Sequence, residues 1–219
     1  MLLLKLLHLL CWVYWLGGDL GTFYASRFVA DPSLSPAARA TAAKIMMGAD
    51  IAPRLCLPLT LVTGLHLASL SGALALSNAL LWALWLVCGV WLCAVWVIHH
   101  GHGAARLKRI IQLDFGLRVL LSAGLGMVSG AGLLGMLDAV APWLALKLLC
   151  FSCAVACGLA IRVQLRDFGP AFARLVQHGP DEAGDQVIRQ SIAACIPFVI
   201  TIWVLLLISA ATGLHLLRL

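Results

Sequence analysis

The sequence predicts an all-α fold, a polytopic membrane helical bundle with six transmembrane helices. Of its 219 residues, 63% are hydrophobic and only 11% are charged, and the mean hydropathy is +1.02. A chain of this composition cannot cover a soluble core with polar surface, so we expect it to lie in a lipid bilayer.

Six stretches of about 20 apolar residues are long enough to cross the hydrocarbon core. They are Leu2 to Ser26, Ile51 to Leu70, Asn78 to Ile98, Leu113 to Leu137, Trp143 to Leu165 and Ile192 to Leu216. Because they leave almost no room for a soluble domain, we expect residues 1–219 to form a single transmembrane domain. The first stretch lacks the basic start of a signal peptide, so we expect it to be retained as a helix.

The basic residues predict the orientation of the spans. Of the 15 lysines and arginines, 12 flank the first, third and fifth connections. They are Arg27, Arg39, Lys44, Arg54, Arg106, Lys108, Arg109, Arg118, Arg162, Arg166, Arg174 and Arg189. Cytoplasmic loops carry an excess of Lys and Arg, so we expect both termini on the periplasmic side of a bacterial inner membrane. The net charge of +6 therefore reflects topology and gives no reason to expect nucleic-acid binding.

Two connections are long enough to hold helices of their own. The first contains an alanine-rich segment from Ala37 to Met47, with Ser35 as N-cap and Pro36 at the first helical position. This pattern predicts a short helix that lies on the inner membrane surface. The fifth connection is predicted to be helical from Phe168 to Val176.

An internal repeat relates residues 1–72 to residues 141–219. Each half has a lysine-bearing start, a basic connection and a helix that ends in a histidine motif. The matching segments are Lys5-Leu-Leu-His8 with Lys147-Leu-Leu-Cys150, and Thr63-Gly-Leu-His66 with Thr212-Gly-Leu-His215. Spans one and two are therefore predicted to correspond to spans five and six.

The first span carries polar and aromatic side chains at helical spacing. His8, Trp12, Trp15 and Asp19 follow the i, i+4, i+7, i+11 pattern and so share one face. Polar groups inside a membrane are costly in free energy and usually functional, so this face is expected to pack against other helices and not against lipid.

Three histidines are predicted at one depth near the outer face. His8 lies about 10 Å inside the membrane, and His66 and His215 each lie about 6 Å inside. Neutral imidazole is a good axial ligand for haem iron, and the propionates of haem need cations. Those cations would come from Lys5, Lys147 and Arg218, and Trp12 and Trp15 would wall the site. The alternative is that the histidines are interfacial residues bonded to backbone or water.

A second polar pair is predicted nearer the cytoplasmic side. Asp19 lies 11 residues inward of His8, and Arg54 lies 12 residues inward of His66 in the antiparallel second span. The two side chains are therefore level, and a structural ion pair between them would offset much of the cost of burying either charge.

The residues around His8 carry a family resemblance. Leu7-His8-Leu-Leu with Trp15-Leu-Gly-Gly18, and Trp143-Leu-Ala-Leu-Lys147-Leu, resemble helices of the copper-resistance-D-like (CopD-like) membrane proteins and of the HemJ-type protoporphyrinogen oxidases. The resemblance implies a bundle that holds haem b, with His8 as a ligand and Lys147 as a functional lysine. The chain departs from the HemJ pattern in its two extra spans, in Asp19, and in Cys157-Gly158.

These observations give three functional hypotheses. The first is a haem b protein that passes electrons between the quinone pool or a membrane partner and a periplasmic acceptor, with the redox chemistry carried by the cofactor. The second is a copper uptake or resistance protein. The third is an anchor subunit of a redox complex that docks through the glycine face of span four around Gly126-xxx-Gly130. A homo-oligomer is a further alternative. Whether the protein is an oxidoreductase stays open.

Overall fold

The structure is a computed structural model that describes residues 1–101, 105–137, 140–214 and 216. All regular structure in these ranges is helical. The helices are α1 (Leu2–Ala30), α2 (Pro36–Leu70), α3 (Asn78–His100), α4 (Ala105–Leu133), α5 (Pro142–Gln164), α6 (Phe168–His178) and α7 (Glu182–Gly213). All except α6 are long and apolar enough to cross a membrane, which confirms the six predicted spans and a multi-pass membrane protein.

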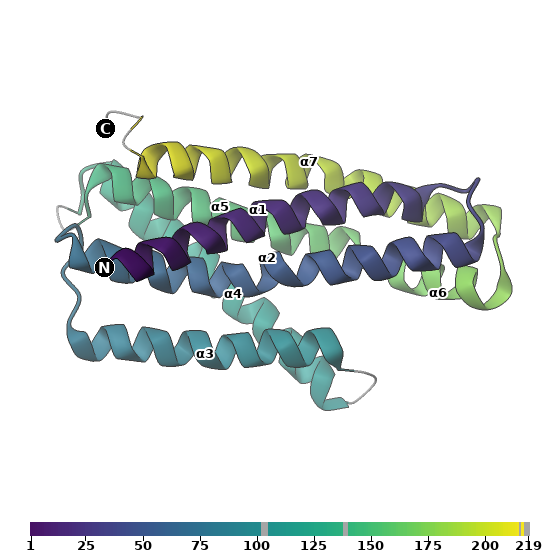
Figure 1. Ribbon diagram of the computed structural model, residues 1–219, viewed down its shortest axis with the longest axis horizontal. Coiled ribbons are helices and arrows are strands. Elements are labelled where there is room, and N and C mark those ends of the chain that lie inside the picture. Colours follow the sequence, from purple (N-terminus) through teal and green to yellow (C-terminus); the bar gives the residue numbers. More distant parts are fainter. Residues whose placement is uncertain (102–104, 138–139, 215, 217–219) are drawn as a thin grey trace.

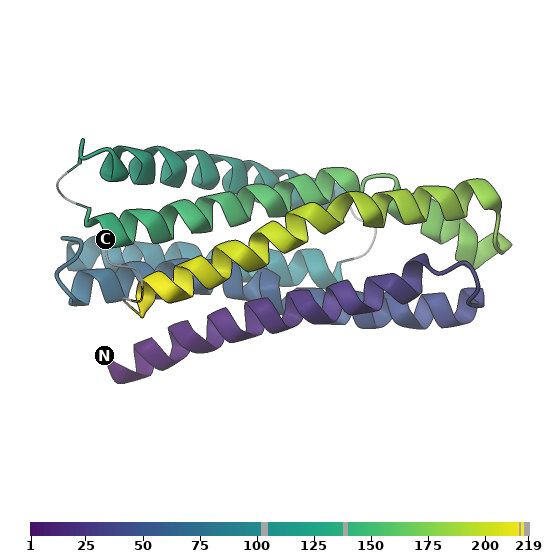
Figure 2. The same ribbon diagram turned by 90° about the horizontal axis from the view of Figure 1, so that it is seen from above.

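The long helices lie side by side along one axis, and successive ones run in opposite directions (Figure 1). We call the end with the N-terminus and the last turn of α7 the His8 end, and the opposite end the α6 end. The two closest helix pairs are the hairpin α1–α2 and the pair α5–α7, and α4 packs on α5. In Figure 2, α7 (yellow) runs obliquely between α5 (green) and α1 (purple). Helix α3 lies at the edge, against α2 and α4.

The predicted surface helix in the first connection is wrong. Its residues form the first part of α2, which runs without interruption for 35 residues from Pro36, or about 50 Å. Ser35 is the N-cap, as predicted, and its hydroxyl accepts the N–H of Ala38 at 3.2 Å. Pro53 lies inside the helix without ending it.

A buried ion pair fixes this first part of α2 against α1 and α7. The guanidinium of Arg39 has 0% side-chain exposure and lies 2.6 Å from Asp185 of α7. Its Nε also donates to the carbonyl of Val29 at the end of α1, at 2.9 Å. Three helices are thus joined at the α6 end, and the segment cannot lie flat on a membrane surface.

The glycine face of α4 packs within the protein. A Cβ on Gly126 would come within 3.1 Å of Ser152 Oγ, and one on Gly132 within 3.1 Å of the Ala145 Cβ. Both partners belong to α5, so these two glycines allow α4 and α5 to approach closely. A methyl group on Gly130 would meet nothing within 4 Å.

Candidate functional site

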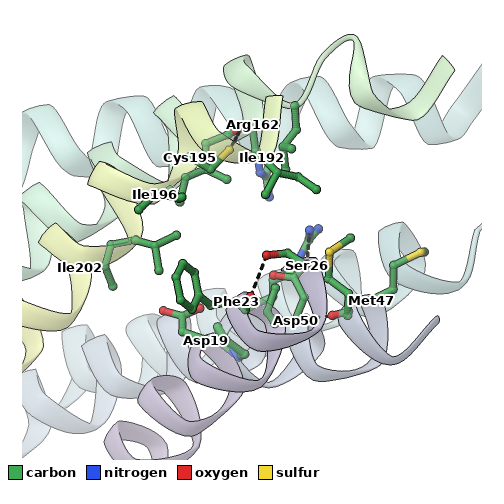
Figure 3. Close-up of a pocket in the computed structure, with 18 of the residues that line it drawn as sticks. Asp19, Phe23, Ser26, Met47, Asp50, Arg162, Ile192, Cys195, Ile196 and Ile202 are labelled. Carbon is green, nitrogen blue, oxygen red and sulfur yellow. Dashed lines mark hydrogen bonds and ion pairs between the residues drawn. The ribbon is translucent and has the colours of Figure 1, made fainter. Parts of the chain in front are cut away.

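A cavity of about 330 Å³ lies inside the bundle, nearer to the α6 end. Figure 3 shows Asp19, Phe23 and Asp50 from α1 and α2 on one side, facing Arg162 of α5 and Ile196 of α7 on the other. Most of the wall is aliphatic or aromatic. It also contains six charged side chains, namely Asp19, Arg27, Asp50, Arg54, Arg118 and Arg162.

Two of these arginines share one carboxylate. Asp114 of α4 is almost fully buried, and its Oδ2 lies 3.0 Å from Arg118 Nε and 2.7 Å from Arg162 Nη1. Its Oδ1 accepts the indole N–H of Trp91 from α3 at 2.7 Å. Arg118 also lies over the Trp91 ring, 5.4 Å from its centroid. The cluster joins α3, α4 and α5, and it holds two guanidinium groups for a single acid.

The opposite wall holds a second pair. Arg54 forms an ion pair with Asp50, one turn earlier on α2. This differs from the predicted pairing of Arg54 with Asp19, although both residues line the same cavity. Asp50 and Arg54 are four residues apart on one helix, so their pairing requires no particular placement of α1.

Asp19 is left without a counterion in the described ranges. Its Oδ2 is buried and has no hydrogen-bond partner. Asp19 lines the cavity beside Phe23 (Figure 3). Arg27, two turns further along α1, lies over the ring of Phe23 at 5.0 Å from its centroid. A carboxyl group in this position is a polar site that a ligand or a proton can satisfy.

An apolar layer separates the cavity from the His8 end. The ring of Trp15 borders the cavity and packs edge-on against Phe151 of α5, with the ring centroids 5.8 Å apart. One turn closer to the His8 end, the indole N–H of Trp12 donates to the carbonyl of Leu206 in α7 at 3.1 Å. Trp12 and Trp15 therefore connect α1 with α7 and α5.

Beyond this layer, His8 contacts the second helix. Its Nδ1 lies 2.8 Å from Thr63 Oγ1, and the Thr63 hydroxyl donates its proton to the carbonyl of Leu59 at 2.6 Å. With its own proton directed at Leu59, Thr63 is able to accept a hydrogen bond from His8 Nδ1. The backbone of Thr60 is a further hydrogen-bond partner of His8. Lys147 of α5 lies close enough to interact with His8 electrostatically.

The other predicted haem residues are placed differently. The Nδ1 of His66 accepts the indole N–H of Trp85 from α3 at 3.1 Å. In the neutral imidazole the ring proton then lies on Nε2, and a protonated Nε2 does not bind iron. Lys5 is exposed. His215 and Arg218 lie outside the described residues. The structure therefore brings His8 and Lys147 together and turns His66 toward α3.

The repeated motifs have corresponding surroundings. Thr63 and Thr212 are both fully buried, and each donates to the carbonyl four residues earlier, at 2.6 and 2.8 Å. The glycine that follows each threonine lies close to a polar side chain of the neighbouring helix, α1 for Gly64 and α5 for Gly213. A Cβ on Gly64 would lie 3.1 Å from His8 Cε1, and one on Gly213 would lie 3.0 Å from Lys147 Nζ.

The sequence reasoning missed Asp50, Asp114 and the roles of Arg118 and Arg162. Three of these four lie inside the predicted spans, where an ionisable residue is a functional candidate by default. The i, i+4 spacing of Asp114 and Arg118 was a further signal. We treated both arginines as topology signals, because each lies close to a basic connection.

Within the described ranges, no group of three or more His, Cys, Asp or Glu side chains is placed to hold a metal ion. Comparisons with family models, curated proteins and solved structures give no match for this chain.

Proposed function

We propose that this protein is a membrane transporter that binds a small amphipathic organic anion in the cavity. The observation that carries the proposal is the excess of guanidinium charge in the wall, where Arg118 and Arg162 share the single carboxylate of Asp114. A bound anion supplies the negative charge that balances this excess.

The position of the cavity supports transport. It lies between the hairpin α1–α2 and the pair α5–α7, which are the two halves of the predicted repeat. Transporters built from repeats bind substrate at the interface between the halves and expose it by moving one half against the other. The layer around Trp15 and Phe151 closes the side toward His8. In this proposal the α6 end faces the cytoplasm of a bacterial inner membrane, which the excess of Lys and Arg in the connections at that end supports.

The cavity also limits the ligand. Small-molecule pockets usually measure about 300–1,000 Å³, and this one, at about 330 Å³, suits a molecule with one or two rings. The apolar wall favours a hydrocarbon body, and the arginines favour a carboxylate, sulfonate or phosphate head. Naphthalenesulfonate is a suitable probe, because it has both parts and does not cross a bilayer unaided.

The test is uptake of naphthalenesulfonate into vesicles that contain the purified protein. We expect saturable uptake that naphthoate inhibits and that naphthylmethylammonium, with the same rings and a positive head, does not. Vesicles without protein provide the background. Uptake no faster than that background would refute the transport function.

One observation favours haem binding as a second candidate function. The Nδ1 of His8 lies 2.8 Å from the Thr63 hydroxyl, and metal-binding histidines typically donate one ring N–H to such a partner and bind the metal through the other nitrogen. Lys147 is available beside it for a propionate. In this candidate function haem would supply the redox chemistry, and His8 and Lys147 would bind and orient it.

The visible absorption spectrum tests this second candidate. Haem bound through His8 predicts a Soret band in the purified or haem-reconstituted protein that is lost in His8→Ala and kept in His66→Ala. Absence of a Soret band after reconstitution would refute haem binding. It would not affect the proposal that the protein transports an organic anion.

A further inference from the structure

In the part of the chain that the structure describes, Asp19 has no positive partner on any helix that faces it. On α2, Arg54 is paired with Asp50. On α4 and α5, Arg118 and Arg162 are both held by Asp114. The titratable group that α7 contributes to the wall is Cys195, whose thiol donates to the carbonyl of Ser191 at 3.2 Å.

An ionised carboxylate with these neighbours is costly. Its buried Oδ2 has no donor. The Trp15 side chain is a hydrogen-bond partner of Asp19, but the carboxylate of Asp50 on α2 repels a negative charge there. Binding a proton removes the unpaired charge, which is the usual response of a buried acid that lacks a counterion. The protonation of Asp19 therefore depends on what else occupies the cavity.

The charges around the cavity set the direction of this dependence. Four arginines face three aspartates once Asp114 is included. The excess is one positive charge when Asp19 is ionised and two when it is protonated. An anion is therefore bound more tightly when Asp19 is protonated, because the cavity then carries the larger positive charge. Because coupling between two ligands is reciprocal, a bound anion also favours protonation of Asp19.

We propose that Asp19 takes up one proton with each anion that binds and releases it when the anion leaves, so that the protein cotransports protons with organic anions. This inference rests on the proposed transport function and adds its coupling ion. A monovalent anion and one proton enter together, and no net charge moves. The carboxyl oxygen of Asp19 holds the proton while the arginines hold the anion.

The experiment measures naphthalenesulfonate binding and proton uptake together in weakly buffered solution. The sulfonate stays ionised across neutral pH, so any proton taken up belongs to the protein. In the wild type we expect uptake of up to one proton per anion, and an affinity that falls as the pH rises, by about 5–150-fold in total. Asp31→Asn, which changes a half-buried aspartate after α1 and outside the cavity wall, should behave as the wild type.

Asp19→Asn should bind the sulfonate without proton uptake and with an affinity that does not change with pH. Asp19→Glu, which restores a carboxyl group, should recover the proton uptake. Binding by the wild type with no proton uptake would overturn the coupling and leave the anion site standing, as would Asp19→Asn with wild-type pH dependence. Absence of binding in the wild type at every pH would overturn both proposals.

Discussion

Replacing Arg162 by glutamine is expected to weaken naphthalenesulfonate binding about tenfold to a hundredfold. Hydrogen bonds to charged groups contribute about 1.5–3 kcal/mol, and each 1.4 kcal/mol corresponds to a tenfold change in affinity. Arg162 lies in the cavity wall with a quarter of its side chain exposed, so its guanidinium can reach a ligand. Quenching of tryptophan fluorescence measures the affinity, because Trp15 borders the cavity.

The fold should survive this replacement. Asp114 keeps Arg118 and the indole N–H of Trp91 as partners. The matched control is Arg166→Gln, which removes the same charge from an exposed position one turn further on and outside the cavity wall. If Arg162→Gln and Arg166→Gln bind the anion equally well, the guanidinium of Arg162 does not hold the ligand.

Replacing Arg39 by methionine is expected to lower the stability of the protein more than any surface change. Arg39 is fully buried, and its loss leaves Asp185 without its ion-pair partner and the carbonyl of Val29 without its donor. Breaking a buried pair on one side costs about 3–5 kcal/mol. The measurement is the thermal unfolding midpoint in detergent, which should fall clearly below that of the wild type.

Two further variants show whether the loss comes from the unpaired acid. Lys44→Met removes an exposed charge from the same helix and should unfold at the wild-type temperature. The double variant Arg39→Met, Asp185→Leu should recover part of the loss, since replacing both members of a buried pair by apolar residues is often neutral. An unfolding midpoint for Arg39→Met equal to that of Lys44→Met would mean that the pair does not hold the α6 end together.

The membrane spans could be predicted because they follow from local composition. Each is a long apolar window, and the start of α2 follows from the capping chemistry of Ser35 and Pro36. The merging of residues 37–47 into α2 could not be predicted, because it depends on contacts of Arg39 with Val29 and Asp185, far apart in the sequence.

The sequence predicts the common depth of Asp19 and Arg54 but neither their actual pairing nor the cavity that they line. Counting residues along antiparallel helices correctly suggested that Asp19 and Arg54 lie in one part of the bundle, and both border the cavity. Counting cannot choose between two acids within reach of one arginine, and Arg54 takes Asp50. The same limit applies to His66, whose depth does not reveal that Trp85 of α3 occupies its Nδ1.

The expectation of haem binding concerns the His8 end, and the proposed transport site lies on the other side of the Trp15 layer. Haem binding at His8 stays a prediction with its own spectroscopic test. The two ends can therefore be examined independently, because His8 variants do not alter the cavity wall and Arg162 variants do not touch His8.

The central claim is that the cavity selects for negative charge, and the most direct measurement compares the affinities of two probes that differ only in their heads. The account predicts that the wild type binds naphthalenesulfonate at least about tenfold more tightly than naphthylmethylammonium, a difference of about 1.4 kcal/mol. It also predicts that Arg162→Gln reduces this preference. Equal affinities, or tighter binding of the cation, would contradict it.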